Sequence, residues 1–265
     1  MKKLFAIVAI LLITGFCYSQ QIATVVQDGN YNTANVTQIQ SYGASVSLYA
    51  TQSGNYNVLN GTQTGDNNYY QLIQGLGNYN YANVDQEGVS DAGAQNYSTQ
   101  TQSGNNNNSI LKQGNLTGDP YGNANYTMNT AYAVQSGNNN SYNATQGSGW
   151  KSNNYHNLLQ SGNYNSAIMN QNGHYEYSTL TQLGNYNYAE LNQPAGGGTG
   201  SELDSYSYQN GNYNTAYISQ VNGVNNSQSW QTGNNNYTNV YQWGYNSDAF
   251  GQQTGSTNTY DLLQK

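Results

Sequence analysis

The feature that most constrains this chain is a glutamine that recurs, mostly at steps of eleven residues, from Gln27 to Gln264 near the C-terminus. A segment of eleven residues is too short for a domain, but it accommodates one β-strand and one tight turn. The series therefore predicts a stack of small, similar units. Its members are Gln27, Gln38, Gln52, Gln63, Gln74, Gln86, Gln102, Gln113, Gln135, Gln146, Gln160, Gln171, Gln182, Gln193, Gln209, Gln220, Gln231, Gln242, Gln253 and Gln264.

Taken in pairs, these glutamines define two alternating kinds of step. Within a pair the step is eleven residues, except for the twelve residues from Gln74 to Gln86, whereas the step to the next pair varies from 11 to 22 residues. One edge of fixed length and one edge that accepts insertions are typical of a two-sided coil. We therefore expect an all-β fold over residues 20–265: a β-solenoid of about ten two-stranded coils, with 20 short strands and a repeat of about 22 residues.

The turn that follows the first glutamine of each pair is nearly constant, as in Gln-Asp-Gly-Asn-Tyr-Asn from Gln27. Glycine and asparagine tolerate positive φ angles, so we expect the Gly-Asn pair to adopt them there. Residues two apart share one face of a strand, which places Asn32, Ala34, Val36 and Gln38 together. We expect this face to point inward, with stacked copies of the same amide hydrogen-bonded at the strand spacing of about 4.8 Å.

The predicted ladder consists of the glutamines, the turn glycine and the second turn asparagine of each well-formed repeat. These residues are Gln27, Gly29, Asn32, Gln38, Gln52, Gly54, Asn57, Gln63, Gln102, Gly104, Asn107, Gln113, Gln135, Gly137, Asn140, Gln146, Gln160, Gly162, Asn165, Gln171, Gln182, Gly184, Asn187, Gln193, Gln209, Gly211, Asn214, Gln220, Gln231, Gly233, Asn236 and Gln242.

Tyrosines recur at the same turns, and stacked coils would place them in one column along an edge. Such a column stabilises the sheet, or it binds a ligand or a surface; the sequence leaves both interpretations open. The tyrosines are Tyr31, Tyr56, Tyr79, Tyr164, Tyr186 and Tyr213.

The N-terminus has the pattern of a secretory signal peptide over residues 1–19. Two lysines precede an apolar run that ends at Phe16, and Ser19 suggests cleavage before Gln20. Lipidation of Cys17 is the alternative, although Phe16 is bulky for that position. Removal of this segment leaves no cysteine and, with two lysines gone, takes the formal charge from −7 to −9. Such a chain is not expected to bind nucleic acid by charge, and we expect no membrane insertion of the mature chain.

The composition argues against an ordinary globular core, because charged residues make up 6% of the chain and 28 of its 265 residues are tyrosine. A disordered tract rich in asparagine and glutamine is the alternative. Disorder does not require a fixed spacing, and here the spacing is kept across long insertions.

No residues form a convincing catalytic, cofactor or metal site. We find no nucleophile and base to propose, so we do not expect an enzyme. His156 and His174 lack the partners of a zinc motif, the glycine-rich segment 196–200 lacks the lysine of a phosphate loop, and Glu202 with Asp204 would bind calcium weakly.

Both ends of the predicted solenoid carry strand-like segments, 21–27 and 259–264, without a proline to block them. Open ends of this kind invite head-to-tail addition of further copies without closure, which would produce a filament.

The pattern Gln-x-Gly-x-x-Asn-x-Ala-x-x-x-Gln, filled here by Gln27, Gly29, Asn32, Ala34 and Gln38, resembles the curlin repeat. The resemblance implies a structural subunit of curli-type amyloid fibres, secreted to the surface of a Gram-negative cell for biofilm formation and adhesion. It also implies three partners: further copies of the chain, a nucleator curlin and an outer-membrane secretion pore. The chain departs from the family in its larger number of repeats and in lacking the segment that directs the major subunit to its pore.

Two alternatives to a main fibre subunit remain. The chain could be the nucleator or minor subunit, although its last repeat has no basic residue except Lys265. It could also be a monomeric solenoid adhesin that binds a surface or a glycan. Its outward positions mix threonine, asparagine, tyrosine and valine irregularly, which argues against the regular threonine rows of an ice-binding face.

Overall fold

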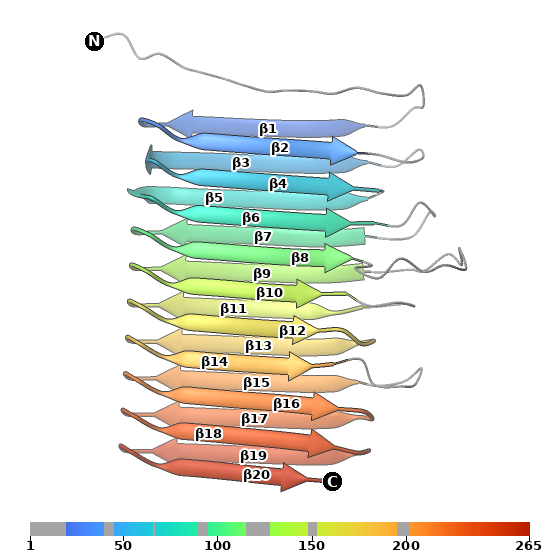
Figure 1. The fold of residues 1–265 in the computed structure, drawn as a ribbon, viewed down its shortest axis with the longest axis vertical. Coiled ribbons are helices and arrows are strands. Elements are labelled where there is room, and N and C mark those ends of the chain that lie inside the picture. The colour runs from blue at the N-terminus through green and yellow to red at the C-terminus, as the bar shows by residue number, and fades with distance from the viewer. Residues whose placement is uncertain are drawn as a thin grey trace.

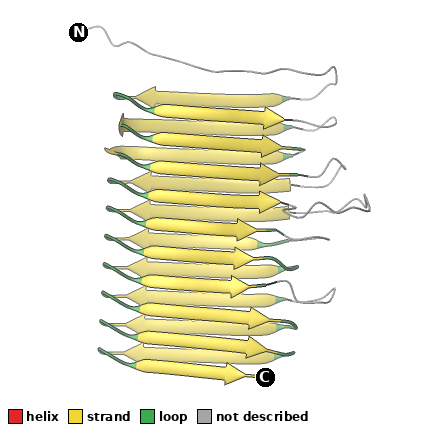
Figure 2. Ribbon diagram, viewed as in Figure 1, coloured by secondary structure: helices red, strands yellow, loops and turns green. Residues whose placement is uncertain are grey.

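The computed structural model describes residues 20–39, 45–65, 67–88, 95–114, 128–147, 153–194 and 202–265. The predicted signal peptide and the glycine-rich segment 196–200 lie outside the described residues. Within the described ranges the chain forms twenty strands joined by turns (Figure 2), and no helix there is long and apolar enough to cross a membrane.

The strands follow one another along the chain as a continuous series. They are β1 (Gln21–Asp28), β2 (Thr33–Ile39), β3 (Val46–Asn55), β4 (Val58–Thr64), β5 (Asn68–Asn78), β6 (Tyr81–Glu87), β7 (Gln95–Ser103), β8 (Asn108–Gly114), β9 (Met128–Ser136), β10 (Ser141–Gln146), β11 (Tyr155–Ser161), β12 (Ser166–Gln171), β13 (Glu176–Leu183), β14 (Tyr188–Gln193), β15 (Leu203–Asn210), β16 (Thr215–Val221), β17 (Asn225–Thr232), β18 (Tyr237–Trp243), β19 (Ser247–Thr254) and β20 (Thr259–Gln264).

These strands form two parallel sheets that face each other (Figure 1). In the described chain the odd-numbered strands make one sheet of ten and the even-numbered strands make the other, each in chain order. Equivalent glutamines pair in register, as Gln27 does with Gln52 and Gln146 with Gln171. The predicted all-β solenoid of two-stranded coils is confirmed.

The two edges of the solenoid differ in their turns. We call the edge with the turns from odd to even strands the strict edge, and the opposite edge the open edge. Every range left out between β1 and β20 falls between an even strand and the next odd one, and so on the open-edge side of the chain. The twelve-residue step is absorbed at the strict edge as a bulge in β5, where Gly54 pairs with Gly77 and Leu76 lies exposed.

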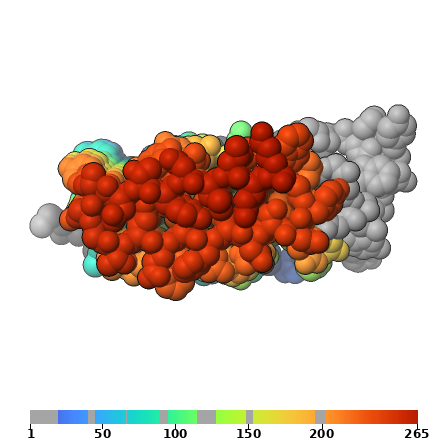
Figure 3. All heavy atoms as spheres, turned by 90° about the horizontal axis from the view of Figure 1, so that it is seen from below, coloured from blue at the N-terminus to red at the C-terminus, as the bar shows by residue number. Residues whose placement is uncertain are grey.

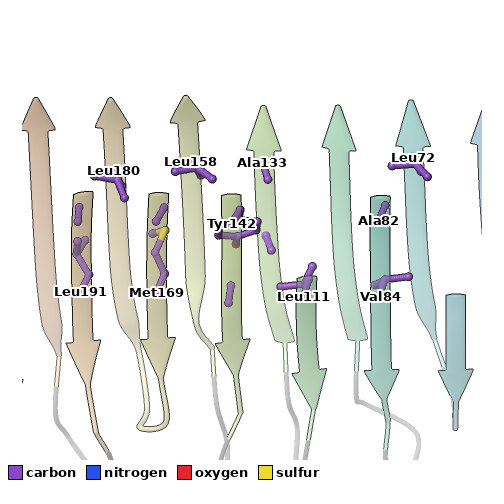
Figure 4. Packing of buried hydrophobic residues seen from close by; sticks show 14 of the residues in the cluster. Leu72, Ala82, Val84, Leu111, Ala133, Tyr142, Leu158, Met169, Leu180 and Leu191 are labelled. Carbon is purple, nitrogen blue, oxygen red and sulfur yellow. The ribbon is translucent and has the colours of Figure 1, made fainter. Parts of the chain in front are cut away.

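The core lies between the two sheets and is one side chain deep from each. Strand residues alternate between buried and partly exposed, as in β12 and β14, so one face of each strand packs inward. Leucine, valine, methionine and alanine from facing strands interdigitate there (Figure 4). In the end coils the inward Val36 and Leu262 are only partly buried. From below, the last coil forms the surface of that end (Figure 3).

Candidate functional site: the amide ladders and their open ends

The first glutamines of the coils form one continuous ladder inside the strict edge. Each Nε2 donates to the Oε1 of the next copy at 2.6 to 3.1 Å, and most of these side chains are fully buried. The run is Gln27, Gln52, Gln74, Gln102, Gln135, Gln160, Gln182, Gln209, Gln231 and Gln253. Nε2 also donates to a backbone carbonyl across the coil, as from Gln160 to Ser141 at 3.0 Å. Both amide hydrogens of an interior glutamine are therefore used.

The second glutamines form an equivalent ladder inside the open edge. Their Nε2 to Oε1 distances lie between 2.8 and 3.1 Å, and the donation runs in the same direction, toward the C-terminal end. The run is Gln38, Gln63, Gln86, Gln113, Gln146, Gln171, Gln193, Gln220, Gln242 and Gln264. Because every link has the same direction, each ladder has a donor end and an acceptor end.

The second asparagine of each strict turn ties that turn to both neighbouring coils. Asn165 Nδ2 donates to the carbonyl of Gly184 in the following coil at 2.8 Å, and the backbone N–H of Asn165 donates to Asn140 Oδ1 in the preceding coil at 3.0 Å. The same backbone bond to Oδ1 recurs from coil to coil over Asn32, Asn57, Asn80, Asn107, Asn140, Asn165, Asn187, Asn214, Asn236 and Asn258.

The turn glycines lie where these coils come closest. Gly29, Gly54, Gly104, Gly137, Gly162, Gly184, Gly211 and Gly233 all have positive φ, and a Cβ at each would overlap the carbonyl group of the glycine in the next coil. Only glycine therefore fits this position at a stacking distance set by the sheets.

A further ladder passes through the first turn asparagine, which we expected to adopt positive φ together with the glycine. That expectation was wrong: Asn163 is absent from the positive-φ positions, whereas the following Tyr164 has φ 57°. Asn163 instead donates from its backbone N–H and from Nδ2 to Asn185 Oδ1, both at 3.0 Å. The repeated Gly-Asn pair was the available signal for this ladder. It runs through Asn30, Asn55, Asn78, Asn105, Asn138, Asn163, Asn185, Asn212 and Asn234.

The turn tyrosines stack in two groups of three. Tyr31, Tyr56 and Tyr79 have ring centroids 4.9 Å apart. Tyr164, Tyr186 and Tyr213 form the other group, at 4.8 and 4.9 Å with the rings nearly parallel. Asn106 and Asn139 occupy the same positive-φ position in the coils between the two groups. The predicted column is therefore present but interrupted.

A buried histidine and a buried glutamate depart from the repeat. His156 of β11 lies in the core with Nδ1 3.4 Å from the Tyr142 hydroxyl, and burial lowers its pKa to about 3. Glu176 of β13 accepts from the Gly173 N–H at 2.9 Å, and burial raises its pKa to about 8 against the effect of that bond. The sequence pattern predicts an ordinary strand or loop position for His156 and does not single out Glu176. Among the described residues no three His, Cys, Asp or Glu side chains gather as a metal site.

The two ends of the solenoid carry opposite halves of the ladder. At the N-terminal end, Gln38 Oε1 has no hydrogen-bond partner among the described residues. At the C-terminal end, Gln253 and Gln264 donate to the carbonyls of Tyr237 and Asp248, and within the described ranges neither Nε2 donates to a further glutamine. The N-terminal end therefore has glutamine acceptors without donors, and the C-terminal end has glutamine donors without glutamine acceptors.

The backbone groups at the two ends are complementary in the same way. Val46 N–H donates to the Gln20 carbonyl, so Gln20 and every second residue after it direct their backbone groups toward β3. The residues between them, including Ala23, point their N–H and C=O away from β3. Tyr237 N–H donates to the Asn258 carbonyl, so Asp261 of β20 points its backbone groups away from β18. Both end coils therefore present open strand edges.

Comparison of the chain with protein-family models, curated proteins and solved structures gave no match.

Proposed function

We propose that this chain is a structural subunit of a secreted, extracellular fibre of the curli type, which elongates by stacking the C-terminal coil of one copy on the N-terminal coil of the next. The observation that carries the proposal is the complementarity of the ends. Donors of Gln253 and Gln264 lie at one end, and acceptors of Gln27 and Gln38 lie at the other, in the register that the interior coils already use.

A junction between two copies would repeat the interior geometry. Placing Gln253 over Gln27 of a second copy and Gln264 over Gln38 continues both glutamine ladders, and Asn258 Oδ1 then meets the N–H of Asn32. Head-to-tail contacts of this kind do not close, so the product is a filament rather than a ring. The parallel, in-register stacking of identical side chains is that of cross-β assemblies.

Secretion and the remaining partners rest on the sequence. The predicted signal peptide over residues 1–19 and the absence of cysteine after Cys17 suit an exported chain. The resemblance to curlin repeats supports a role in the biofilm matrix and in adhesion, with a nucleator curlin and an outer-membrane pore as partners. The function proposed is assembly and involves no catalysis.

The direct test is growth of fibres from purified residues 20–265. We expect thioflavin-positive fibres with a meridional reflection at about 4.8 Å, the spacing of strands along the axis. Seeds of preformed fibres should remove any lag. A chain that stays monomeric for weeks, with or without seeds, would contradict the proposal.

A proline in β1 tests whether the ends make the junction. Ala23→Pro removes an N–H that points away from β3 and so spares the fold, because proline is tolerated on the open side of an edge strand. We expect no fibres from this variant alone, since every junction needs one N-terminal end. Small amounts should block one of the two ends of wild-type fibres. Ala23→Val keeps the N–H and is the matched control; equal growth of both variants would overturn the mechanism.

A further inference from the structure

The outer face of the sheet of odd-numbered strands, here called the odd face, carries a column of exposed apolar side chains. Val26, Ile73, Val134, Leu159 and Trp230 are each between 39 and 53% exposed. Successive strand registers align them in a single column, with threonine or tyrosine at the coils between. Apolar, threonine or tyrosine side chains therefore form a strip from β1 to β17, and Gln252 follows Trp230 in β19.

Beside this strip runs a chain of tyrosine contacts over seven coils. Some neighbours are stacked, as Tyr155 and Tyr177 are at 4.6 Å with an interplanar angle of 2°, and others are tilted, as Tyr97 and Tyr132 are at 5.8 Å. The stacked pairs, Tyr69 with Tyr97 and Tyr155 with Tyr177, cover one another's ring faces, and the tilted pairs add further apolar ring surface beside the strip.

The odd face is also free of charge where it is most apolar. Between β3 and β13 the described outward residues of this sheet include no Asp, Glu, Lys or Arg. The opposite outer face carries Asp85, Glu87, Lys112 and Glu190. Outside this range the same face carries Asp28, Asp204 and Asp248, so it is the part from β3 to β13 that can meet a second copy without burying unpaired charges.

The uncharged part of the face approaches the size of a standard interface. Its six strands, β3 to β13, at a spacing of about 4.8 Å, with about seven residues of about 3.3 Å each, give roughly 670 Å² per copy. A standard protein interface buries about 800 Å² per partner. Two sheets packed face to face at about 10 Å would cover the apolar strip of both copies.

We propose that the odd face is a lateral interface at which two copies of this chain pair. The pairing is independent of growth at the ends, so it is tested on the Ala23→Pro chain, in which end-to-end junctions are blocked. Sedimentation should show a monomer–dimer equilibrium. Val134→Glu with Leu159→Glu should raise the dimer dissociation constant roughly a hundredfold, because four carboxylates would be buried without partners.

The matched control places the same charges on the other sheet. Asn143→Glu with Ile168→Glu alters the outward side of β10 and β12 and should leave the dimer intact. Circular dichroism and urea midpoints of both variants verify folding. A strictly monomeric Ala23→Pro chain, or equal dissociation by both pairs of charges, would overturn the proposal. If the Ala23→Pro chain forms no dimer but binds a soluble β-glucan, and Val134→Glu with Leu159→Glu abolishes this binding, the face binds a polysaccharide instead.

A cysteine provides a second measurement that does not depend on charge. Leu159 lies in the sixth of the ten coils, near the middle of the face, so two copies bring this position together whether they pair parallel or antiparallel. Residues 20–265 of the unchanged chain contain no cysteine, so an introduced cysteine can pair only with its copy in another chain. Mild oxidation of Leu159→Cys should therefore give disulfide-linked dimers in several-fold excess over Ile168→Cys on the other sheet. Equal yields from both variants would contradict a lateral interface at the odd face.

Discussion

The strict and open edges are built from the same coils but tolerate different changes. At the strict edge, two asparagine ladders, one glutamine ladder and a glycine contact repeat from coil to coil. At the open edge only the glutamine ladder is continuous in the described chain, and the inward position at or just before the start of an odd strand is asparagine in several coils but Glu176 in β13 and Leu203 in β15. The coil length is therefore held by amide hydrogen bonds at one edge, and the other edge is free to vary in length.

An insertion of Gly-Ser-Gly-Ser should give the largest difference in stability between a change at the strict edge and the same change at the open edge. Between Asn163 and Tyr164 the insertion breaks the turn bonds to both neighbouring coils, and each buried amide left unsatisfied costs about 1–3 kcal/mol. We expect this variant to lose much of its cooperative unfolding transition. Between the exposed Tyr245 and Asn246, in the open-edge turn from β18 to β19, the cost should stay below about 1 kcal/mol, because loop entropy grows slowly with length.

Urea unfolding followed by far-UV circular dichroism measures both insertions, in the Ala23→Pro background so that fibres do not interfere. A strict-edge insertion that unfolds at the same urea concentration as the open-edge insertion would show that the turn ladders do not hold the coil length.

Glycine replacement gives the next largest effect. Gly162 has φ 117°, and a Cβ there would overlap the Gly184 carbonyl. Gly162→Ala should therefore destabilise the chain by about 3 kcal/mol or more, through backbone strain and displacement of the next turn. At Gly75, in the bulge of β5, a Cβ would lie 3.7 Å from the Gln102 carbonyl oxygen, an ordinary van der Waals contact, so Gly75→Ala should change the stability by less than about 0.5 kcal/mol. Similar urea midpoints for the two variants would refute the role of the glycine contact.

Much of this arrangement could be predicted from spacing alone. The inward set of Asn, small, aliphatic and Gln residues follows from counting back in twos from each glutamine, and the unequal steps identify which edge varies. Both predictions need only the two-residue period of a strand and the fact that insertions fit where turns are not packed.

The missed features depend on three-dimensional contacts that spacing does not encode. The positive φ of Tyr164 falls after the Gly-Asn pair, because the Asn163 side chain is used in a ladder. The core location of His156 follows from its even offset from Gln160, but a histidine was not expected at an aliphatic position. The apolar odd face appears only when the strand registers are known.

Because Glu176 is buried, we expect the stability of the fold to depend on pH, and this dependence originates at the open edge. Its folded pKa of about 8 lies above the unfolded value of 4.5, so the unfolded chain releases the proton first as the pH rises. Stability should fall between pH 4.5 and 8 by a few kcal/mol in total and then level off. Glu176→Gln should remove this fall and raise the urea midpoint at pH 8. The exposed Glu87→Gln is the control, and an unchanged pH profile in Glu176→Gln would refute the assignment.

The smallest expected effect is the difference in stability between a tyrosine substitution at the strict edge and one at the open edge. Tyr186 at the strict edge has φ 57° and stacks on Tyr164 and Tyr213, whereas Tyr175 at the open edge has φ 54° and no ring partner among the described residues. Asparagine is favoured over tyrosine at positive φ, so both substitutions relieve backbone strain. Tyr186→Asn also loses two ring contacts, which in exposed positions contribute about 0.5 kcal/mol each.

We therefore expect Tyr175→Asn to be neutral or slightly stabilising and Tyr186→Asn to be less stable than it by about 1 kcal/mol. Urea midpoints of the two variants in the Ala23→Pro background measure the difference directly, since the backbone term is shared. An equal response would mean that the stacked tyrosines contribute nothing to the coil. Their retention at the strict edge would then require a role outside the fold, such as contact with a surface, and the interpretation of the column as a structural element would be wrong.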